Sequence, residues 1–241
     1  MTSNVNFFFF IIIFFTCLLI YLKFRKRQKV VYIVSFPKCG RTWLKYILNK
    51  VFIDYYKLQD VEEDSINLKS LSKKNTRIPL VIDTHDNSNI VNEDGYKPDP
   101  HLMFNDLNKD RFANKNVLFI VRDPRDVVVS HYHQITKRSK SPMQFDSLSD
   151  FIRDPVFGFN RVIAFYEIWF HNQSVPKNFS FIKYEDILSN GVVSVNSILD
   201  FILPENNNSD VLGSSLTVPY FKVISESQDY TFTPTWFDND I

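Results

Sequence analysis

The segment Val30–Lys50 constrains the fold of this chain more than any other part of its sequence. Its first five residues, Val30 to Val34, form an apolar run that predicts a buried strand. Pro37 and Gly40 end this strand, and the residues from Thr42 onward have the apolar spacing of an amphipathic helix. A strand that leads through a short turn into a helix indicates an α/β fold.

The turn between this strand and helix has the composition of an anion-binding site. It contains Lys38, Arg41 and Thr42. A helix N-terminus presents backbone N–H groups and a positive dipole end, and the added cations favour phosphate or sulfate. The alternative is an ordinary turn that carries lysine and arginine on its surface.

Two other phosphate-binding loops do not match this turn. The NTPase loop G-x-x-x-x-G-K-[ST] has its lysine directly after the second glycine, whereas Lys38 precedes Gly40. A cysteine-phosphatase loop would place arginine six positions after Cys39, where the chain has Lys45. The sequence therefore argues against a nucleotide kinase of the P-loop type.

Composition narrows the class of protein further. The 241 residues are 44% apolar, which is enough for the core of one large domain or two small ones. A net charge of +1 gives no reason to expect a nucleic-acid partner. The two cysteines, Cys17 and Cys39, imply no disulfide framework, and no His/Cys/Asp cluster has metal-ligand spacing.

After Lys50 the chain alternates short apolar strands with helices. The strands are expected at Leu80–Ile82, Val117–Val121 and Phe179–Tyr184, and the helices at Pro124–Gln134, Phe159–Phe170 and Val193–Ile202. This alternation predicts a three-layer α/β/α domain with a mostly parallel central sheet. Ligands of such sheets bind at the carboxyl ends of the strands, where the candidate residues of this chain fall.

A second candidate segment is Val117–Gln134, VLFIVRDPRDVVVSHYHQ. Arg122 follows the buried strand, Asp123 is placed to cap the next helix, and Ser130 lies eight residues after Arg122. A guanidinium fixed in this way suits a phosphate group. The alternative is a structural ion pair between Arg122 and Asp126.

Together these two segments resemble the nucleotide-binding motifs of sulfotransferases, [YF]-P-K-x-G-[TR]-T-W and R-[ND]-P-[KR]-D-x-x-x-S. The matching residues are Phe36, Pro37, Lys38, Gly40, Arg41, Thr42, Trp43, Arg122 and Ser130. The resemblance covers roughly residues 30–202. It implies the P-loop NTPase-like sulfotransferase fold and 3′-phosphoadenosine 5′-phosphosulfate (PAPS) as co-substrate, without a metal.

The resemblance also implies residue roles. PAPS-binding residues would be Lys38, Cys39, Gly40, Arg41, Thr42, Trp43, Arg122, Ser130 and Tyr184. Lys38 would also act in catalysis by stabilising the bridging oxygen, and Arg122 and Ser130 would bind the 3′-phosphate. Trp43 and Tyr184, the latter in a Y-E-D segment, would contact adenine. The alternative for each aromatic residue is a packing role.

His85 is the candidate catalytic base. It follows a predicted strand in the segment Ile82-Asp83-Thr84-His85, which resembles the T-H context of sulfotransferases that act on hydroxyl groups. An imidazole is suited to take the proton of an attacking hydroxyl. The alternatives are a loop histidine without function, or His131 or His133 as the base.

Three features depart from the family pattern. Asp83 stands where lysine is common, and we expect it to alter the electrostatics or to pair with a cation such as Lys38. Cys39 stands where serine is usual, and its position beside Lys38 at a helix N-terminus predicts a lowered thiol pKa and redox sensitivity. The basic glycine-containing segment R-K-G-x-x-G-x-[WY] is missing, because after Gly213 the only basic residue is Lys222.

The apolar run Phe7–Leu22 predicts an N-terminal transmembrane helix. As a helix it would reach roughly 24 Å, somewhat less than a hydrocarbon core of about 30 Å. Met1–Asn6 has no basic residue, so an uncleaved signal-anchor is favoured over a cleaved signal peptide. The basic residues that follow the run are Lys23, Arg25, Lys26 and Arg27, and they favour a cytoplasmic domain, with the Golgi lumen as the alternative.

The expected organisation is a membrane anchor at 1–29, a sulfotransferase domain at 30–225 and a tail at 226–241. The resemblance implies an enzyme that transfers a sulfuryl group from PAPS to a hydroxyl on a small molecule, lipid or carbohydrate. Asn87–His101 and Lys137–Phe145 are the loops expected to form the acceptor pocket. The alternative is a non-catalytic or truncated relative that binds PAPS or adenosine 3′,5′-bisphosphate and has lost its C-terminal lid.

Overall fold

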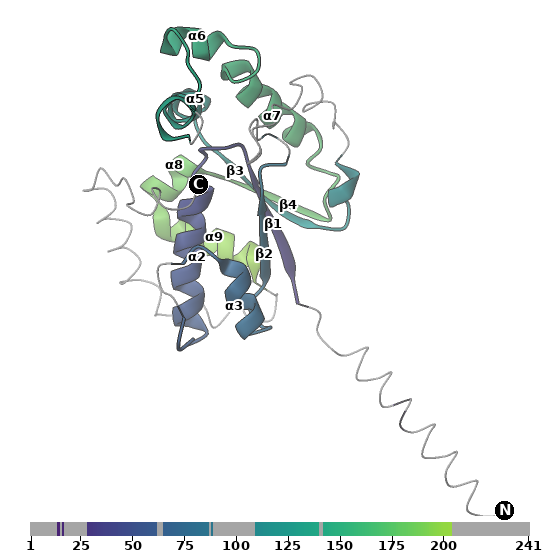
Figure 1. Ribbon diagram of the computed structural model, residues 1–241. Coiled ribbons are helices and arrows are strands. Elements are labelled where there is room, and N and C mark those ends of the chain that lie inside the picture. The colour runs from purple at the N-terminus through teal and green to yellow at the C-terminus, as the bar shows by residue number, and fades with distance from the viewer. Residues whose placement is uncertain are drawn as a thin grey trace, which may run out of the picture.

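The computed structural model describes residues 28–61, 65–86, 88, 109–139 and 142–203, together with Phe14 and Thr16. In this part of the chain four strands form one sheet in the order β2-β1-β3-β4. The strands are β1 (Val30–Ser35), β2 (Leu80–Thr84), β3 (Asn116–Val121) and β4 (Asn178–Lys183). Every neighbouring pair is parallel, which confirms the predicted parallel sheet (Figure 1).

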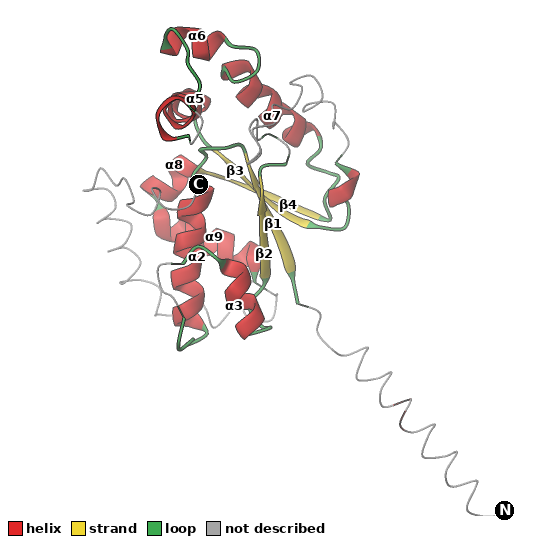
Figure 2. Ribbon diagram, viewed as in Figure 1, coloured by secondary structure: helices red, strands yellow, loops and turns green. Residues whose placement is uncertain are grey.

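Helices cover both faces of this sheet (Figure 2). They are α2 (Arg41–Tyr55), α3 (Leu68–Lys74), η1 (Asp110–Phe112), α5 (Pro124–His133), η2 (Gln134–Arg138), α6 (Leu148–Arg153), α7 (Phe159–His171), α8 (Tyr184–Ser189) and α9 (Gly191–Ile202). In the view of Figure 1, α2, α3 and α9 lie on one side of the strands and α7 on the other. The predicted α/β arrangement is therefore correct.

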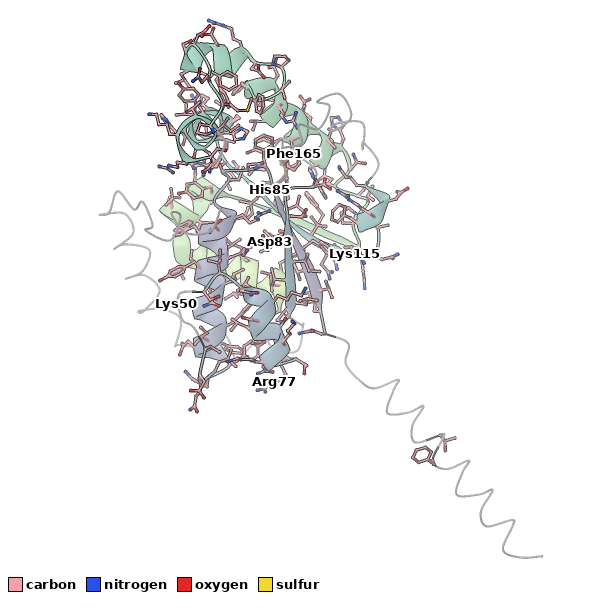
Figure 3. The ribbon with its side chains drawn as sticks, viewed as in Figure 1. Lys50, Arg77, Asp83, His85, Lys115 and Phe165 are labelled. Atoms are coloured by element: carbon pink, nitrogen blue, oxygen red, sulfur yellow. The ribbon has the colours of Figure 1, made fainter. Side chains whose placement is uncertain are left out.

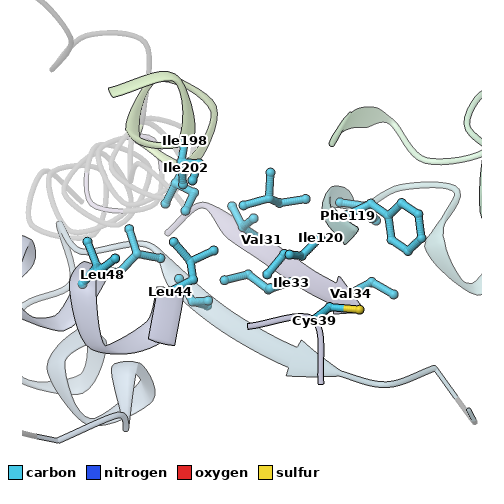
Figure 4. Close-up of a cluster of buried hydrophobic side chains, with 14 of the residues drawn as sticks. Val31, Ile33, Val34, Cys39, Leu44, Leu48, Phe119, Ile120, Ile198 and Ile202 are labelled. Carbon is cyan, nitrogen blue, oxygen red and sulfur yellow. The ribbon is translucent and has the colours of Figure 1, made fainter. Parts of the chain in front are cut away.

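One face of the sheet packs against α2 and α9. The side chains in this layer alternate along the strands, as the two-residue period of a strand requires. They include Val31, Ile33 and Ile120 from the strands, Leu44 and Leu48 from α2, and Ile198 and Ile202 from α9, all at most 2% exposed (Figure 4). Burial of this layer fixes the axis of α2 relative to β1, and so places the turn between them.

The other face packs against α7 through aromatic rings. Phe119 on β3 is stacked on Trp169 with ring centroids 5.6 Å apart, and it also contacts Phe165 at 5.9 Å and Tyr166 at 6.0 Å. Aromatic pairs of this kind add roughly 0.5–1.5 kcal/mol each beyond their burial. They hold α7 in register with β3, so that Tyr166 reaches the end of the strand.

The strand order places two turns side by side. The chain leaves β1 to form β2 on one side of it and later forms β3 on the other side. The turn after β1 and the turn after β3 therefore meet at the carboxyl end of the sheet, at a topological switch point. The second turn enters α5, where the Asp123 side chain accepts a hydrogen bond from the Arg125 N–H at 2.9 Å, as expected of an N-cap.

Two local predictions were wrong. Lys137 and Arg138 were expected in a loop, but they belong to the π-helical turn η2 that continues α5. Tyr184 was expected to end a strand, but it is the first residue of α8. In both places a helix starts or continues without a glycine or proline signal.

Three predicted features fall outside the described residues. They are the anchor Phe7–Leu22 apart from Phe14 and Thr16, the loop Asn87–His101 apart from Ser88, and everything after Leu203. Among the residues that are described, no helix has both the length and the apolar character needed to cross a membrane.

Candidate functional site

The turn after β1 has an unusual backbone. Lys38 has a φ of 71° and Gly40 a φ of 86°, so both lie in the left-handed region. Such a φ is strained for a residue with a side chain, and glycine avoids that strain. A Cβ atom at Gly40 would also overlap the ring of Tyr184. Gly40 is therefore required both by the turn, from which α2 starts at Arg41, and by the close approach of Tyr184.

Arg122 reaches this turn from the end of β3. Its Nη1 donates to the Lys38 carbonyl oxygen at 3.3 Å, and its guanidinium lies 4.5 Å from the centre of the Tyr184 ring. The ion pair with Asp126 is also present, with 3.5 Å between Nη2 and Oδ2. The buried Nε of Arg122 has no hydrogen-bond partner among the described residues. The ion pair with Asp126, which was the alternative explanation of Arg122, is therefore present together with a contact between Arg122 and the loop.

Tyr166 on α7 connects the two turns, and it was not among the candidate residues identified from the sequence. Its hydroxyl donates to the Arg122 carbonyl oxygen at 2.9 Å and accepts from the Arg122 N–H at 3.1 Å. It also lies 3.2 Å from the Cys39 Sγ. The hydroxyl thus fixes the backbone of Arg122 beside the turn that contains Cys39.

The prediction of a reactive thiol at Cys39 was wrong. Cys39 is 1% exposed, and its side chain belongs to the cluster of buried hydrophobic side chains shown in Figure 4. Burial raises the pKa of the Cys39 thiol to about 12, a larger effect than the hydrogen bond to Tyr166, which lowers it. Cys39 can therefore contribute only backbone groups to a ligand.

Lys38 is held by a side chain that the sequence analysis did not identify. Its Nζ donates to the Gln134 Oε1 at 3.1 Å, and Gln134 opens the π-helical turn η2. Burial lowers the pKa of Lys38 to about 8, helped by the positive charges of Arg138 and Arg122. The ammonium remains mostly protonated at pH 7, and it loses its charge more easily than an ordinary lysine does.

His85 lies just beyond β2 (Figure 3). Its Nδ1 is 2.9 Å from the Ser35 carbonyl oxygen. A carbonyl oxygen only accepts, so a neutral ring in this contact carries its proton on Nδ1 and leaves the lone pair of Nε2 for a proton transfer. Burial, followed by the charge of Arg41, lowers the pKa of His85 to about 4, so the ring is neutral at pH 7.

The rival base His131 is built into the core. It is 6% exposed, and its ring packs edge-on against Phe36 and Phe151 at centroid distances of 5.7 and 5.8 Å. His133 makes an edge contact with Tyr132 at 5.3 Å. Packing therefore accounts for His131, whereas His133 is half-buried.

Asp83 pairs with different cations from the one expected. Its carboxylate contacts the Arg41 Nε at 3.2 Å and the Lys45 Nζ at 3.1 Å, and both partners lie on α2. The expected pairing with Lys38 is not seen among the described residues, because Lys38 is turned toward Gln134. The carboxylate is neutralised within the wall of the site.

The remaining candidates border the same region. The rings of Trp43 and Tyr184 meet edge-on, with centroids 5.5 Å apart. Thr42 lies in the first turn of α2 and Ser130 in the second turn of α5, and both are half-buried. Within the described ranges, no group of three or more His, Cys, Asp or Glu side chains is arranged to hold a metal ion.

Comparison with known proteins adds a family match. The model of the sulfotransferase domain matches residues 28–224. The flavonol 3-sulfotransferase of Flaveria bidentis is 26% identical over 216 residues, which are 84% of this chain and 67% of the relative. The sulfotransferase 6B1 of Mus musculus is 26% identical over 217 residues, 86% of this chain and 62% of the relative.

The name of a third relative specifies a different class of acceptor, an amine. The amine sulfotransferase of Oryctolagus cuniculus is 23% identical over 197 residues, 76% of this chain and 60% of the relative. The chain therefore spans between 60% and 67% of the lengths of these three proteins.

Proposed function

Since the chain belongs to the sulfotransferase domain family, we propose that it transfers a sulfuryl group from PAPS to a hydroxyl acceptor. One observation carries the proposal. The anion loop at Lys38, the guanidinium of Arg122 and the imidazole of His85 gather at one end of the sheet, with Arg122 in contact with the loop backbone. A reaction between an anionic donor and a hydroxyl needs these three elements.

The hydrogen-bond donors of the site fit a ligand that has two separate anionic ends. Arg122 Nε and Arg41 Nη1 are both buried, and neither has a hydrogen-bond partner in the described part of the chain. A buried N–H without a partner costs about 1–3 kcal/mol, which oxygen atoms of a bound phosphate or sulfuryl group would offset. The start of α2 would hold the 5′ end of PAPS, and Arg122 with Ser130 the 3′-phosphate.

Each catalytic residue would have one task in the transfer. As the acceptor oxygen bonds to sulfur, the bond from sulfur to the bridging oxygen breaks, and adenosine 3′,5′-bisphosphate leaves with the electron pair. His85 Nε2 would take the proton of the acceptor hydroxyl, while the Nδ1–H of the same ring stays hydrogen-bonded to the Ser35 carbonyl oxygen. The Lys38 ammonium would stabilise the charge that develops on the bridging oxygen.

The test separates binding from transfer. In the full chain, binding of adenosine 3′,5′-bisphosphate is measured by calorimetry, and transfer by ³⁵S from labelled PAPS to an acceptor. We expect His85→Ala to lower transfer by roughly 10²–10⁴-fold while affinity for the bisphosphate stays within about twofold. Lys38→Ala should lower transfer as well. Lys57→Ala, which breaks an exposed ion pair at the far end of α2, is the matched control and should leave both unchanged.

The second candidate is a non-catalytic protein that binds the same nucleotide. The residues after Gly213 include no arginine and no further glycine, so the basic glycine-containing segment of the family pattern is not among them. Tight bisphosphate binding with no transfer to any acceptor would support this candidate over the enzyme. If the full chain binds neither PAPS nor the bisphosphate, both candidates fail.

The acceptor and the location of the protein are also proposals. We would offer a flavonol and an amine, which the names of two relatives specify, together with a lipid and a carbohydrate. The base His85 leads us to expect hydroxyl acceptors to react faster than the amine.

We also propose attachment to a membrane through Phe7–Leu22, with the domain on the cytoplasmic side. Removal of residues 1–27 should then release the protein from sedimented membranes.

A further inference from the structure

A cluster of three charged side chains joins β2 to the beginning of α2. Asp83 accepts contacts from Arg41 Nε at 3.2 Å and from Lys45 Nζ at 3.1 Å. All three side chains are largely buried, with 17% of Arg41, 15% of Lys45 and 29% of Asp83 exposed. One carboxylate between two cations leaves a net positive charge beside the anion loop.

Arg41 uses only part of its guanidinium in this cluster. Its Nε faces Asp83, whereas its Nη1 is buried and has no hydrogen-bond partner among the described residues. A guanidinium is a rigid planar fork, so a carboxylate that holds the Nε edge also sets the direction of the Nη1 edge. Asp83 therefore determines where the second edge of Arg41 points.

The position of Arg41 in the fold indicates what that second edge meets. Arg41 is the first residue of α2 and directly follows Gly40 of the anion loop. After burial, its charge is the largest influence on the pKa of His85, and Lys38 also contributes. Arg41 thus approaches the anion loop and the candidate base, which are the two groups that bracket the transferred group in the proposed reaction.

We propose that Asp83 is a positioning residue that holds Arg41 so that its guanidinium contacts the sulfuryl group during transfer. This inference rests on the proposed function and names one more group that acts on the sulfuryl end of the donor. Arg41 supplies the contact, and Asp83 acts only through Arg41. The geometry is prepared before the donor binds, so little reorganisation is needed in the transition state.

Lys45 provides a matched comparison, because it shares Asp83 but lies one helical turn further along α2 from the loop. A cavity of about 320 Å³ lies between α2, α3 and β2. Lys45 and Asp83 line it together with Asn67 and Lys69, whereas Arg41 does not. Removal of the Lys45 charge breaks an ion pair of the same cluster and leaves the Arg41–Asp83 contact in place.

The experiment compares two ligands that differ only by the sulfuryl group. Affinities for PAPS and for adenosine 3′,5′-bisphosphate are measured by calorimetry without acceptor, and kcat by ³⁵S transfer. We expect Asp83→Asn to weaken PAPS about tenfold, which corresponds to about 1.4 kcal/mol, and to lower kcat by a similar factor. Affinity for the bisphosphate should stay within about twofold. Arg41→Ala should show the same pattern, and the double variant should be no worse than Arg41→Ala alone.

Three results would overturn the inference. One is an equal loss of affinity for both ligands in Asp83→Asn, which would make Asp83 a brace for the whole loop. Another is a loss in Lys45→Met as large as that in Asp83→Asn. The third is full additivity of Asp83→Asn and Arg41→Ala. If the unaltered chain binds the bisphosphate but transfers nothing, the proposed function fails, whereas the affinity comparison between the two ligands still tests the positioning of Arg41.

Discussion

At the scale of single residues, His85 and Lys38 set the pH range in which the site can work. Burial lowers the pKa of His85 to about 4, so its neutral, basic form persists as the pH falls below 6.5. Burial also lowers the pKa of Lys38 to about 8, so its charge is lost as the pH rises through that value. The base and the cation are therefore both in their active forms between these two pH values.

We predict a broad bell-shaped dependence of kcat/KM on pH. Since kcat/KM reports groups of the free enzyme, its acid limb should lie near pH 4 instead of 6.5, and its alkaline limb near pH 8. Rates measured between pH 3.5 and 9.5 check this. Lys38→Arg, whose guanidinium stays charged, should remove the alkaline limb from the residual activity. An acid limb at pH 6.5 that survives in His85→Ala would contradict the assignment of the acid limb to His85.

At the scale of elements, a buried ion pair ties the end of β2 to η1. The Asp86 carboxylate is completely buried and contacts the Lys109 Nζ at 2.8 Å and the Arg111 guanidinium. Lys109 also lies 5.4 Å from the centre of the Trp169 ring on α7. Because Asp86 directly follows His85, this contact anchors the backbone that carries the candidate base.

We predict that Asp86→Ala lowers the free energy of unfolding by about 3–5 kcal/mol, since it leaves buried positive charge without its carboxylate. Urea unfolding monitored by tryptophan fluorescence measures the change. The matched control is Asp54→Ala, which breaks the exposed pair with Lys57 and should cost less than about 1 kcal/mol. Equal effects of the two substitutions would mean that the buried pair contributes no more than a surface one.

The elements also show which parts of the fold and of the site could be predicted from the sequence alone. The strands were predictable because each buried one is an apolar run, and β1 and β3 differ from their predicted ranges by one residue at one end. The helices α6 and α8, each of six residues, are too short to show a helical period. Anion-site residues were found through local motifs. Tyr166 and Gln134 were missed because their contacts join segments that lie far apart in the sequence.

Cys39 shows why local rules can also mislead. Its neighbours, a lysine and a helix N-terminus, favour a thiolate, and the sequence contains only that information. Burial of the side chain depends on α7 and on the packing of Tyr166, and in the folded chain desolvation outweighs those neighbours. Asp83 is a second such case, because its partners were decided by the direction of α2.

At the scale of the whole molecule, two buried histidines couple folding to pH. Burial lowers the pKa of His131 to about 3 and that of His85 to about 4, whereas an unfolded histidine titrates near 6.5. Below pH 6.5 the unfolded chain therefore binds more protons than the folded one, and acid favours unfolding. Above pH 6.5 both states are neutral at these positions, and this coupling disappears.

We predict that stability falls from pH 6.5 toward pH 4 and that His131→Phe makes this fall shallower. Each buried histidine contributes a slope of about 1.4 kcal/mol per pH unit in this window, and phenylalanine keeps the ring between Phe36 and Phe151 without a titrating group. Urea unfolding at pH 5.0, 5.5, 6.0 and 7.5 gives the slope. Carboxylates that titrate in the same range affect both proteins equally, so the difference between the two slopes isolates His131. Parallel slopes would show that His131 is protonated in the folded chain, and that its packing against the two rings does not exclude charge.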